Sequence, residues 1–407
     1  MSAPATSCSF ELILNPSARH DEAYGPSQSA VLNEAGLRHA RLVIGAWPGY
    51  QPTPLVDLPG LAKAAGVSSI HYKDEAHRFG LKSFKPLGGA YAVACLLMQE
   101  ISRLNNGKEI NIQELLDGDY RDECAALTVT AATDGNHGRS VAWGSRMFGC
   151  RCVIFINEAV SEGREKAIAA YGAEVRRNPG SYDDAVRMAG LTAERQGWHV
   201  IPDTSDGDIF DAPRNVTQGY AVMADETIDQ LPYRVPTHMF LQAGVGGMAA
   251  ASCARFWQVF GAARPLTVLV EPYSSACWFE SLKAEQPVAI TGDLDSLMGG
   301  LSCGEVSRVA WPILQTGADA AMKLDDEAAA VTMRLLADGS SGDAPLVAGE
   351  SGVAGLAGFL AVAKDKEARE KLAIDDSSRI VVFGTEGATD SGTYQEIVGK
   401  TPAEVTA

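Results

Sequence analysis

The sequence has no apolar run long enough to cross a membrane, because no window reaches the roughly 18 apolar residues that a membrane helix needs. Its first 16 residues also lack the basic flank and apolar core of a secretory signal. We therefore expect a protein of the cytoplasm. Hydrophobic residues make up 46% of the 407 positions, which is enough to bury a sizeable core.

Basic residues are scarce relative to acidic ones, with 34 Lys and Arg against 51 Asp and Glu and a net charge of −17. A polyanion of this size repels phosphate backbones and anionic lipid. The charge balance argues against nucleic acid and membrane surfaces as partners.

Closely spaced metal ligands are missing as well. None of the eight cysteines forms a C-x-x-C pair, and His71 and His77 lack the i, i+4 spacing that places two ligands on one helix face. Because most of the cysteines lie in apolar runs, we expect reduced core thiols, with no disulfide framework and no metal site.

What the chain does contain is a long alternation of β-branched runs and Ala-rich amphipathic stretches. The expected strands are 67–73, 126–132, 151–157, 173–177, 198–202, 238–243, 266–271 and 379–384. The expected helices are 83–103, 136–148, 161–171, 181–196, 216–230, 247–260 and 351–363. This order predicts an α/β fold with a largely parallel sheet and helices on both faces. At roughly 150 residues per domain, the length predicts two or three domains, or one large fold with an inserted lobe.

Ligands of such folds bind at the carboxyl ends of the strands. The loops at these ends that are rich in glycine and polar residues are 79–89, 133–138, 243–248 and 384–390. The segment 244–248 (GVGGM) has glycines that let backbone N–H groups approach an anion at a helix start, so a phosphate is its natural ligand. A turn without a ligand stays open, and so does a G-x-G-x-x-A dinucleotide site with Glu271 as the ribose-binding acid.

Two other loops carry candidate chemistry. Lys85 lies where a loop turns into a helix expected to start near Ser83, between apolar Phe84 and Leu87. The apolar flanks and the positive end of the helix both lower the pKa expected for this lysine, which suits Schiff-base chemistry. Lys82, on the same loop, is expected to be solvated surface.

The loop 133–138 again joins a strand to a helix. Thr133 or Asn136 is a suitable cap for that helix. Asp134 lies in a glycine-bounded loop above the sheet, which makes it a candidate acid or base.

A series of short motifs follows in a fixed order along the chain. They are KDE at 73–75, RFGL at 78–81, FK at 84–85, TDGNHG at 133–138, QGY at 218–220, QAGVG at 242–246, CGE at 303–305, GESG at 349–352 and TEG at 385–387. The set resembles the fold type II pyridoxal-phosphate enzymes, related to tryptophan synthase β, and more narrowly the diaminopropionate ammonia-lyases. The resemblance favours a cofactor phosphate over a dinucleotide at 244–248.

The resemblance implies two open, twisted, mostly parallel sheets flanked by helices. A large cofactor domain would comprise residues 1–94 and 188–407, and a small mobile domain residues 95–187. It also implies pyridoxal 5'-phosphate as cofactor, an amino acid as substrate and a homodimer as the assembly.

The resemblance also implies roles for individual residues. The cofactor would be joined to Lys85, next to Phe84, with Asn136 on its phenolic oxygen and Thr385 facing the pyridine nitrogen. Its phosphate would be held by Gly244, Val245, Gly246, Gly247 and Met248. A neutral hydroxyl at Thr385 leaves the ring nitrogen largely unprotonated, which favours elimination at the β-carbon over transamination.

Two aspartates complete the implied site. General dehydratases of this fold usually carry serine where Asp134 stands, and a carboxylate is a much stronger base. With Lys85 across the cofactor plane, the α-proton of either enantiomer would find a base. Asp203 matches a second family aspartate and is assigned to the β-ammonium of the substrate or to its proton transfers, with a loop or helix-capping role equally open.

The implied reaction is the elimination of ammonia from D- or L-2,3-diaminopropionate, giving pyruvate and two molecules of ammonia. Residues 205–215 are more acidic than the aromatic-rich segment expected there, so another β-substituted amino acid, similar to serine or threonine, is the alternative substrate. An NAD-dependent oxidoreductase and a binding module without catalysis are more remote alternatives.

Overall fold

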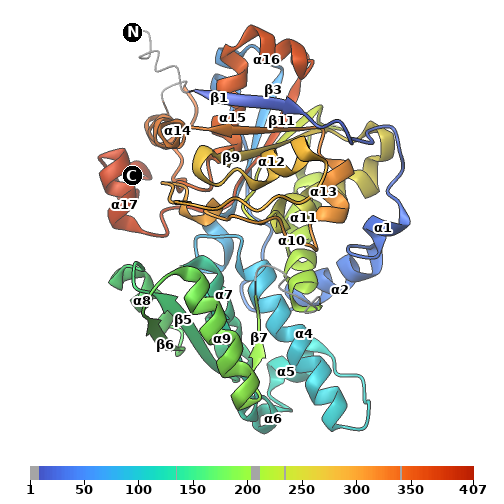
Figure 1. The fold of residues 1–407 in the computed structure, drawn as a ribbon, viewed down its shortest axis with the longest axis vertical. Coiled ribbons are helices and arrows are strands. Elements are labelled where there is room, and N and C mark those ends of the chain that lie inside the picture. The colour runs from blue at the N-terminus through green and yellow to red at the C-terminus, as the bar shows by residue number, and fades with distance from the viewer. Residues whose placement is uncertain (1–8, 134, 203–210, 233–234, 340–341) are drawn as a thin grey trace. The chain divides into compact units, whose positions relative to one another are not determined.

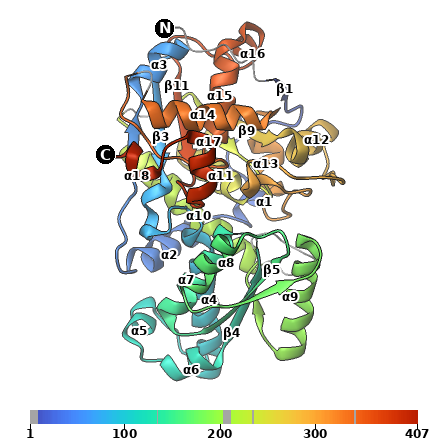
Figure 2. The same ribbon diagram turned by 90° about the vertical axis from the view of Figure 1, so that its left-hand side faces the viewer.

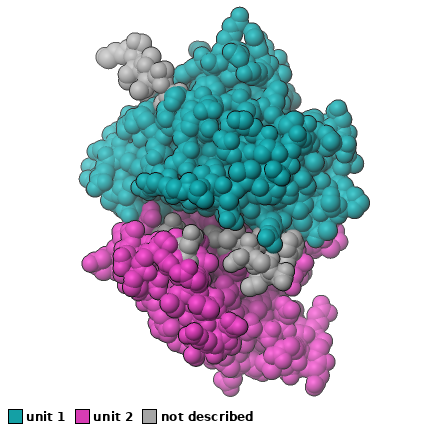
Figure 3. All heavy atoms as spheres, viewed as in Figure 1, with its two compact units in different colours: residues 1–31, 53–77, 224–407 teal, residues 32–52, 78–223 magenta. Residues whose placement is uncertain are grey.

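The computed structural model describes residues 9–407, apart from 134, 203–210, 233–234 and 340–341. The chain divides into two compact units (Figure 3). Unit 1 comprises Met1–Val31, Thr53–His77 and Ala224–Ala407, and unit 2 comprises Leu32–Pro52 and Arg78–Met223. These bounds differ from the expected 95–187, and the mobility of that segment as a small domain stays a prediction.

A mixed seven-stranded sheet forms the centre of unit 1 (Figure 1). In spatial order its strands are β1 (Phe10–Leu14), β10 (Ala320–Leu324), β9 (Leu266–Pro272), β8 (His238–Gln242), β11 (Arg379–Gly384), β3 (Ser69–Asp74) and β2 (Leu55–Asp57). The inner strands pair in parallel, whereas the edge strands β1 and β2 pair antiparallel with their neighbours. Strand β8 is buried at every position because helices cover both faces of parallel sheets.

The helices of unit 1 pack either on this sheet or on the helices that cover it. They are α1 (Pro26–Ser29), α3 (Pro59–Ala65), α11 (Gly247–Phe260), α12 (Cys277–Ala284), α13 (Trp311–Gly317), α14 (Asp326–Asp338), α15 (Ala354–Lys364), α16 (Lys366–Lys371), α17 (Ser391–Val398) and α18 (Pro402–Val405). Helix α15 contacts β8, β9, β10 and β11 (Figure 2). Its Phe359 ring lies 5.5 Å from that of Phe240. Gly358 permits this close approach, because a Cβ there would lie 2.9 Å from Val270.

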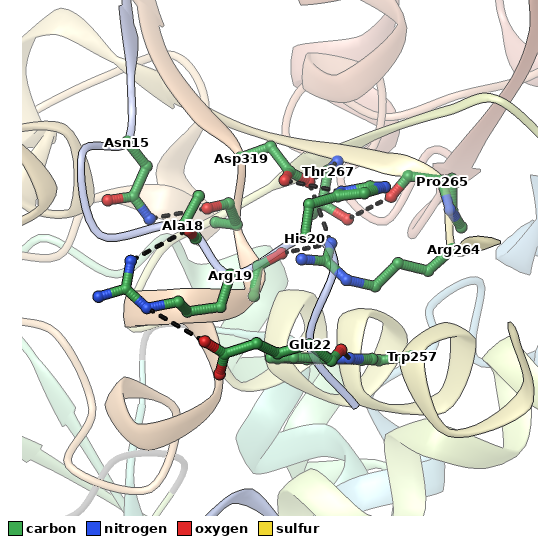
Figure 4. Close-up of polar contacts among 12 residues, drawn as sticks. Asn15, Ala18, Arg19, His20, Glu22, Trp257, Arg264, Pro265, Thr267 and Asp319 are labelled. Carbon is green, nitrogen blue, oxygen red and sulfur yellow. Dashed lines mark hydrogen bonds and ion pairs between the residues drawn. The ribbon is translucent and has the colours of Figure 1, made fainter. Parts of the chain in front are cut away.

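The start of the described chain is fastened to unit 1 through Asp319 (Figure 4). The carboxylate lies 2.9 Å from Nδ1 of His20 and accepts hydrogen bonds from Nη1 of Arg264 at 3.0 Å and the backbone N of Thr267 at 2.8 Å. The guanidinium of Arg264 also lies 4.6 Å from the centre of the Trp257 ring. These contacts, between a buried Arg264 and partly buried Asp319 and His20, hold the segment that follows edge strand β1.

Unit 2 is built on a parallel four-stranded sheet in the order β6 (Glu174–Asn178), β5 (Arg151–Asn157), β4 (Thr128–Ala132) and β7 (His199–Val200). Its helices are α2 (Glu34–Gly45), α4 (Pro86–Leu104), α5 (Ile112–Asp117), α6 (Arg121–Ala126), α7 (Asn136–Phe148), α8 (Glu162–Ala169) and α9 (Tyr182–Gln196). Helices α7 and α8 lead from β4 to β5 and from β5 to β6, and α9 returns to β7. Because such crossovers are right-handed, α9 lies on the opposite face from α7 (Figure 2). Helix α10 (Asp211–Gln230) begins in the unit 2 part of the chain and ends in the unit 1 part.

Close packing of α4 against α7 organises unit 2. A Cβ on Gly89 would lie 2.0 Å from Oγ of Ser140, and a Cβ on Gly144 would lie 2.8 Å from Cα of Ala90. Glycine at both positions therefore lets the two backbones approach closely. This packing fixes the two helix starts that carry Lys85 and Asn136.

The predicted α/β fold with two mostly parallel sheets is confirmed. Strands β5 and β11 and helices α7 and α11 have the predicted bounds. Helix α4 begins at Pro86 and not near Ser83, because proline suits the first helical position. Helices α5 and α6 were not among the predicted elements, and Leu115 of α5 and Tyr120 directly before α6 are buried.

The described part of the chain contains seven free cysteines, of which five are buried, as expected for core thiols. Within the same residues, no group of histidine, cysteine or acidic side chains has the arrangement of a metal site. No helix among the described residues is long and apolar enough to span a membrane.

Candidate active site

The loops singled out in the sequence follow strands, as expected. In unit 1, residues 243–248 follow β8 and residues 385–390 follow β11, its neighbour in the sheet. In unit 2, residues 133–135 follow β4, and residues 81–85 lead into α4. Each unit therefore carries its own set of the predicted site residues, and each set has its own geometry.

The glycine loop of unit 1 leads directly into α11. Gly246 occupies the helix N-cap with φ +99, a backbone conformation that favours glycine, and no side chain caps the helix. A Cβ on Gly244 would lie 3.2 Å from Sγ of Cys303. The first turn of α11 thus starts from a tightly packed loop with glycine at 244, 246 and 247, and the free N–H groups of a helix start are the chemistry that binds phosphate.

Glu271, the acid considered for a ribose, is already engaged within unit 1. It has no exposed surface, and its two oxygens accept hydrogen bonds from the backbone N of Trp278 at 2.8 Å and of Phe279 at 2.7 Å. Burial raises the pKa of Glu271 to about 8, although the two N–H bonds act in the opposite direction. Both oxygens of this fully buried carboxyl group face the start of α12, so Glu271 is not placed to bind a ribose hydroxyl.

Thr385 lies just after β11 and is 4% exposed. Its hydroxyl oxygen accepts a hydrogen bond from Nε2 of Gln242 at 2.8 Å. The carbonyl oxygens of Phe383 and Gly352 lie 2.7 and 3.2 Å from the same nitrogen, so its two hydrogens are shared among three acceptors. The two carbonyls require the amide nitrogen on this side of Gln242. Because Thr385 accepts from Gln242, its own proton is available for an acceptor such as a ring nitrogen.

Further contacts tie the unit 1 loops to one another. Oε1 of Glu386 accepts a hydrogen bond from the backbone N of Ser351 at 3.1 Å, and Oγ of Ser351 accepts one from Gly300 N at 2.9 Å. The carbonyl oxygen of Gly300 would lie 3.2 Å from a Cβ on Gly244. The motifs CGE, GESG and TEG of the sequence therefore surround the glycine loop.

In unit 2, Lys85 occupies the N-cap position of α4, directly before Pro86, and is half-buried. Its Nζ lies 5.5 Å from the centre of the Phe84 ring and 6.0 Å from that of Tyr220. The two rings are 4.5 Å apart. Lys82 is exposed, as expected. The amine of Lys85 thus lies beside two aromatic rings, at the N-terminal end of α4, where the helix dipole is positive.

Asn136 is the first residue of α7. Its Oδ1 accepts a hydrogen bond from Nη1 of Arg139 at 3.3 Å, and Nη2 of Arg139 donates to the carbonyl oxygen of Leu81 at 2.9 Å. The helix start is held by Thr133, whose hydroxyl oxygen accepts from Gly135 N at 3.1 Å and Gly138 N at 3.3 Å. Of the two candidate caps, Thr133 has the capping role, and Asn136 is linked to the loop before Lys85.

Comparisons with known proteins decide which cofactor these groups serve. The family model described as "Pyridoxal-phosphate dependent enzyme" matches residues 46–386. This chain belongs to the family of pyridoxal-phosphate-dependent enzymes. Its cofactor is therefore pyridoxal 5'-phosphate, as predicted, and its substrate is an amino acid.

Within this family the chain is similar to diaminopropionate ammonia-lyases, which confirms the narrower resemblance. It is 36% identical to the enzyme of Escherichia coli K12 over 376 residues, which cover 91% of this chain and 93% of the relative. It is 34% identical to that of Salmonella typhimurium LT2, with 92% and 95% covered. The crystal structure of the E. coli enzyme with an aminoacrylate-PLP azomethine reaction intermediate matches with a TM-score of 0.86 at 34% identity, covering 96% of this chain and 97% of the other.

The residues present fit pyridoxal phosphate. The Gly246 loop has no side chain where an anion must approach the first turn of α11, and the hydroxyl of Thr385 is held by Gln242 with its proton available. Lys85 is at the N-cap of α4, half-buried beside the rings of Phe84 and Tyr220. The individual roles of these residues remain predictions.

Asp134 and Asp203 lie outside the described residues, and so do residues 205–210 of the acidic segment. Their proposed roles therefore remain predictions from the sequence. Residues 211–215 of that segment form the first turns of α10.

Sequence reasoning missed three residues that shape the site. Gln242 and Tyr220 lie within the quoted motifs, but the motifs give no indication that they contact Thr385 and Phe84. Trp278 had no local signal at all. Its contacts with the glycine loop cross more than 30 positions of the chain and appear only in the folded protein.

Proposed function

We propose that this protein uses pyridoxal phosphate to eliminate ammonia from 2,3-diaminopropionate, giving pyruvate and two molecules of ammonia with the uptake of one water. The observation that carries the proposal is the likeness to diaminopropionate ammonia-lyase over 91% of the chain at 36% identity. The described site residues, from Phe84 to Thr385, lie within residues 46–386, which the family model matches.

The cofactor is held at several points in this proposal. When bound, pyridoxal phosphate supplies an aldehyde that joins an amine and a ring that accepts electrons from the α-carbon. The N–H groups of Val245, Gly246, Gly247 and Met248, with Gly244 permitting the approach, bind its phosphate. Lys85 binds its aldehyde, with Phe84 beside it, and the amide of Asn136 binds its phenolic oxygen.

Thr385 donates its proton to the pyridine nitrogen in this proposal. Gln242 supports that direction, because its Nε2 donates to Oγ1 and leaves the threonine proton for the ring. A pyridine nitrogen that accepts a hydrogen bond stays unprotonated. An unprotonated ring withdraws electrons less strongly than a protonated one. The site is thus suited to elimination at the β-carbon and less suited to transamination.

Proton transfer is assigned to Lys85, Asp134 and Asp203. We propose that Lys85 takes the α-proton from one enantiomer and Asp134 from the other, because a carboxylate is a competent base. Asp203 binds the β-ammonium of the substrate or returns a proton to the leaving amine. An acidic pocket also suits a substrate that carries two amino groups.

Purified protein with a panel of amino acids tests the proposal. We expect pyruvate and ammonia in a ratio of one to two from D- or L-2,3-diaminopropionate, and much less product from serine or threonine. A protein that is active only on serine or threonine would be a dehydratase, which is the alternative that the acidic segment 205–215 keeps open. A colourless protein that binds NAD would contradict both.

Asp134→Asn tests the two-base assignment. It should suppress one enantiomer of 2,3-diaminopropionate by about 10²–10⁴-fold and the other much less, because only one direction of proton removal loses its base. Equal losses for both enantiomers would remove the assignment.

We also propose that the protein is a cytoplasmic homodimer with a mobile small domain at residues 95–187. The support is the family resemblance. Sedimentation of the purified protein at micromolar concentration tests the dimer, and limited proteolysis with and without substrate tests the mobility.

A further inference from the structure

Trp278 lies at the start of α12 and is fixed there by Glu271. The N-cap residue Ala276 has no side-chain cap to offer. Glu271, at the end of β9, takes over this task and accepts the backbone N–H groups of Trp278 and Phe279 at 2.8 and 2.7 Å. Two bonds to one buried carboxylate leave the backbone of Trp278 little freedom.

The side chain of Trp278 reaches back to the glycine loop. Its indole Nε1 donates to the carbonyl oxygen of Gly244 at 3.0 Å. Its ring atoms Cζ2, Cε2 and Nε1 would lie 2.4, 2.7 and 2.7 Å from a Cβ on Gly246. The other side of the ring stacks on Trp311, with 5.8 Å between ring centres and 22° between planes. One fully buried side chain thus contacts two of the glycines that lead into α11.

The bond from Trp278 to Gly244 determines where the next N–H group points. In a trans peptide the C=O of one residue and the N–H of the following residue point in opposite directions. With the Gly244 carbonyl held toward the indole, the N–H of Val245 must point away from it. The ring also packs against Gly246. It therefore restricts the backbone at the start of α11, and with it the direction of the N–H groups there.

We propose that Trp278, held by Glu271, is a positioning residue for the phosphate loop and sets the preference of this site for a phosphorylated cofactor. This inference rests on the proposed function, because it takes segment 244–248 as the phosphate site. Trp278 acts through the backbone of Gly244 and touches neither the substrate nor the reacting atoms.

The preference is measured as the ratio of the dissociation constants of pyridoxal and pyridoxal phosphate. Both ligands present the same aldehyde and ring, and only the second needs the loop. We expect Trp278→Phe to weaken pyridoxal phosphate about tenfold and pyridoxal less than about twofold, since a phenyl ring keeps most of the packing but has no N–H donor. The inhibition constant of inorganic phosphate, measured by competition against pyridoxal phosphate, should also rise in the variant. The readout is titration of the cofactor-free protein, followed by absorbance.

Two further variants guard against a merely structural effect. Trp311→Phe replaces the stacked indole by a smaller ring and keeps the Trp278 donor, so its ratio should equal that of the wild type. Glu271→Gln replaces one acceptor of a backbone N–H by an NH₂ group and should lower the ratio in the same direction as Trp278→Phe. If Trp278→Phe does not fold, Glu271→Gln decides alone. Equal losses for both ligands, or an unchanged ratio in Trp278→Phe and Glu271→Gln, would overturn the inference.

The wild type separates this inference from the proposed function. A wild-type protein that binds neither ligand contradicts the proposed function itself. A wild type that prefers pyridoxal phosphate, together with variants that keep the full preference, contradicts only the role of Trp278.

Discussion

The two sets of site residues are positioned by different means. In unit 1 the glycine loop and Thr385 are held by side chains that bond to backbone carbonyls or to the hydroxyl, as Trp278 does to Gly244 and Gln242 to Thr385. In unit 2, Lys85 is placed by close helix packing and lies beside the rings of Phe84 and Tyr220.

The difference matches two chemical tasks. An anion is bound best by dipoles that are already oriented, so that no reorganisation is needed when it arrives. A lysine that would bind the cofactor aldehyde must release it when the substrate amine binds instead. Its side chain must therefore turn between two positions, which the neighbouring aromatic rings would permit. We therefore expect changes in unit 1 to affect mainly affinity and changes in unit 2 to affect mainly the covalent step.

The largest effect should come from Lys85→Ala. The variant should lose the absorbance band near the visible edge and about 10²–10⁴-fold or more of its activity, because both the amine and one base are gone. Pyridoxal phosphate should still bind noncovalently through the unit 1 loop, which equilibrium dialysis measures. A variant that keeps the band would place the covalent bond elsewhere, and one that loses all affinity would show that the two sets do not divide the tasks.

Gly246→Asp should come next and should act on affinity. A carboxylate there repels the phosphate, and any side chain at φ +99 also meets the ring of Trp278. We expect pyridoxal phosphate to bind about 100-fold more weakly, an effect near 2.7 kcal/mol. Gly149→Ala is the matched control, because Gly149 has φ +81 with no atom within 4 Å of its Cβ position. Unchanged affinity in Gly246→Asp would count against this loop as the phosphate site.

Gly89→Ala should disturb unit 2 through packing alone. A Cβ there would lie 2.0 Å from Oγ of Ser140, so we expect unfolding to become easier by about 1–3 kcal/mol. Gly45→Ala, at an exposed position of helix α2 with open space around it, should instead be neutral or stabilising by about 0.5–1 kcal/mol. Urea denaturation compares the two. Equal changes in the free energy of unfolding would mean that α4 and α7 do not pack closely enough to require glycine at position 89.

Glu271 should give unit 1 a pH dependence. Its pKa is raised from 4.5 to about 8 by burial, so between these values the folded protein holds a proton that the unfolded chain has released. The free energy of unfolding should fall as pH rises through this range, by at most about 1.4 kcal/mol per pH unit. Glu271→Gln should flatten the slope, while the neighbouring Cys277 and Glu280 stay unchanged. Parallel curves for the two proteins between pH 5 and 8 would contradict this assignment.

Much of the fold was predictable because it depends on local patterns. The β-branched runs of β5 and β11 and the amphipathic helices α7 and α11 agree with the predicted bounds. Strand β10 was missed, because its sequence AAMKL has weak strand preference and becomes a strand through pairing with β1 and β9. Edge strand β1 was also missed, although its sequence FELIL contains Phe and Ile, which favour strands.

The candidate site was predictable only in part. Glycines and a lysine at the ends of strands signal a cofactor loop, and the ordered motifs added the roles of Asn136 and Thr385. The groups that orient these residues, Arg139, Gln242 and Trp278, are distant in sequence from at least one of their partners, or have no characteristic spacing. Only the folded chain brings such partners together.

The central claim is that one amine of this chain, Lys85, carries the pyridoxal phosphate that the glycine loop binds. Borohydride reduction of the purified protein, followed by digestion and mass spectrometry, tests it directly. We predict a single pyridoxyl-phosphate adduct on the peptide that contains Lys85, at about one per chain. An adduct on another lysine, or none in a protein supplied with the cofactor, would contradict the account.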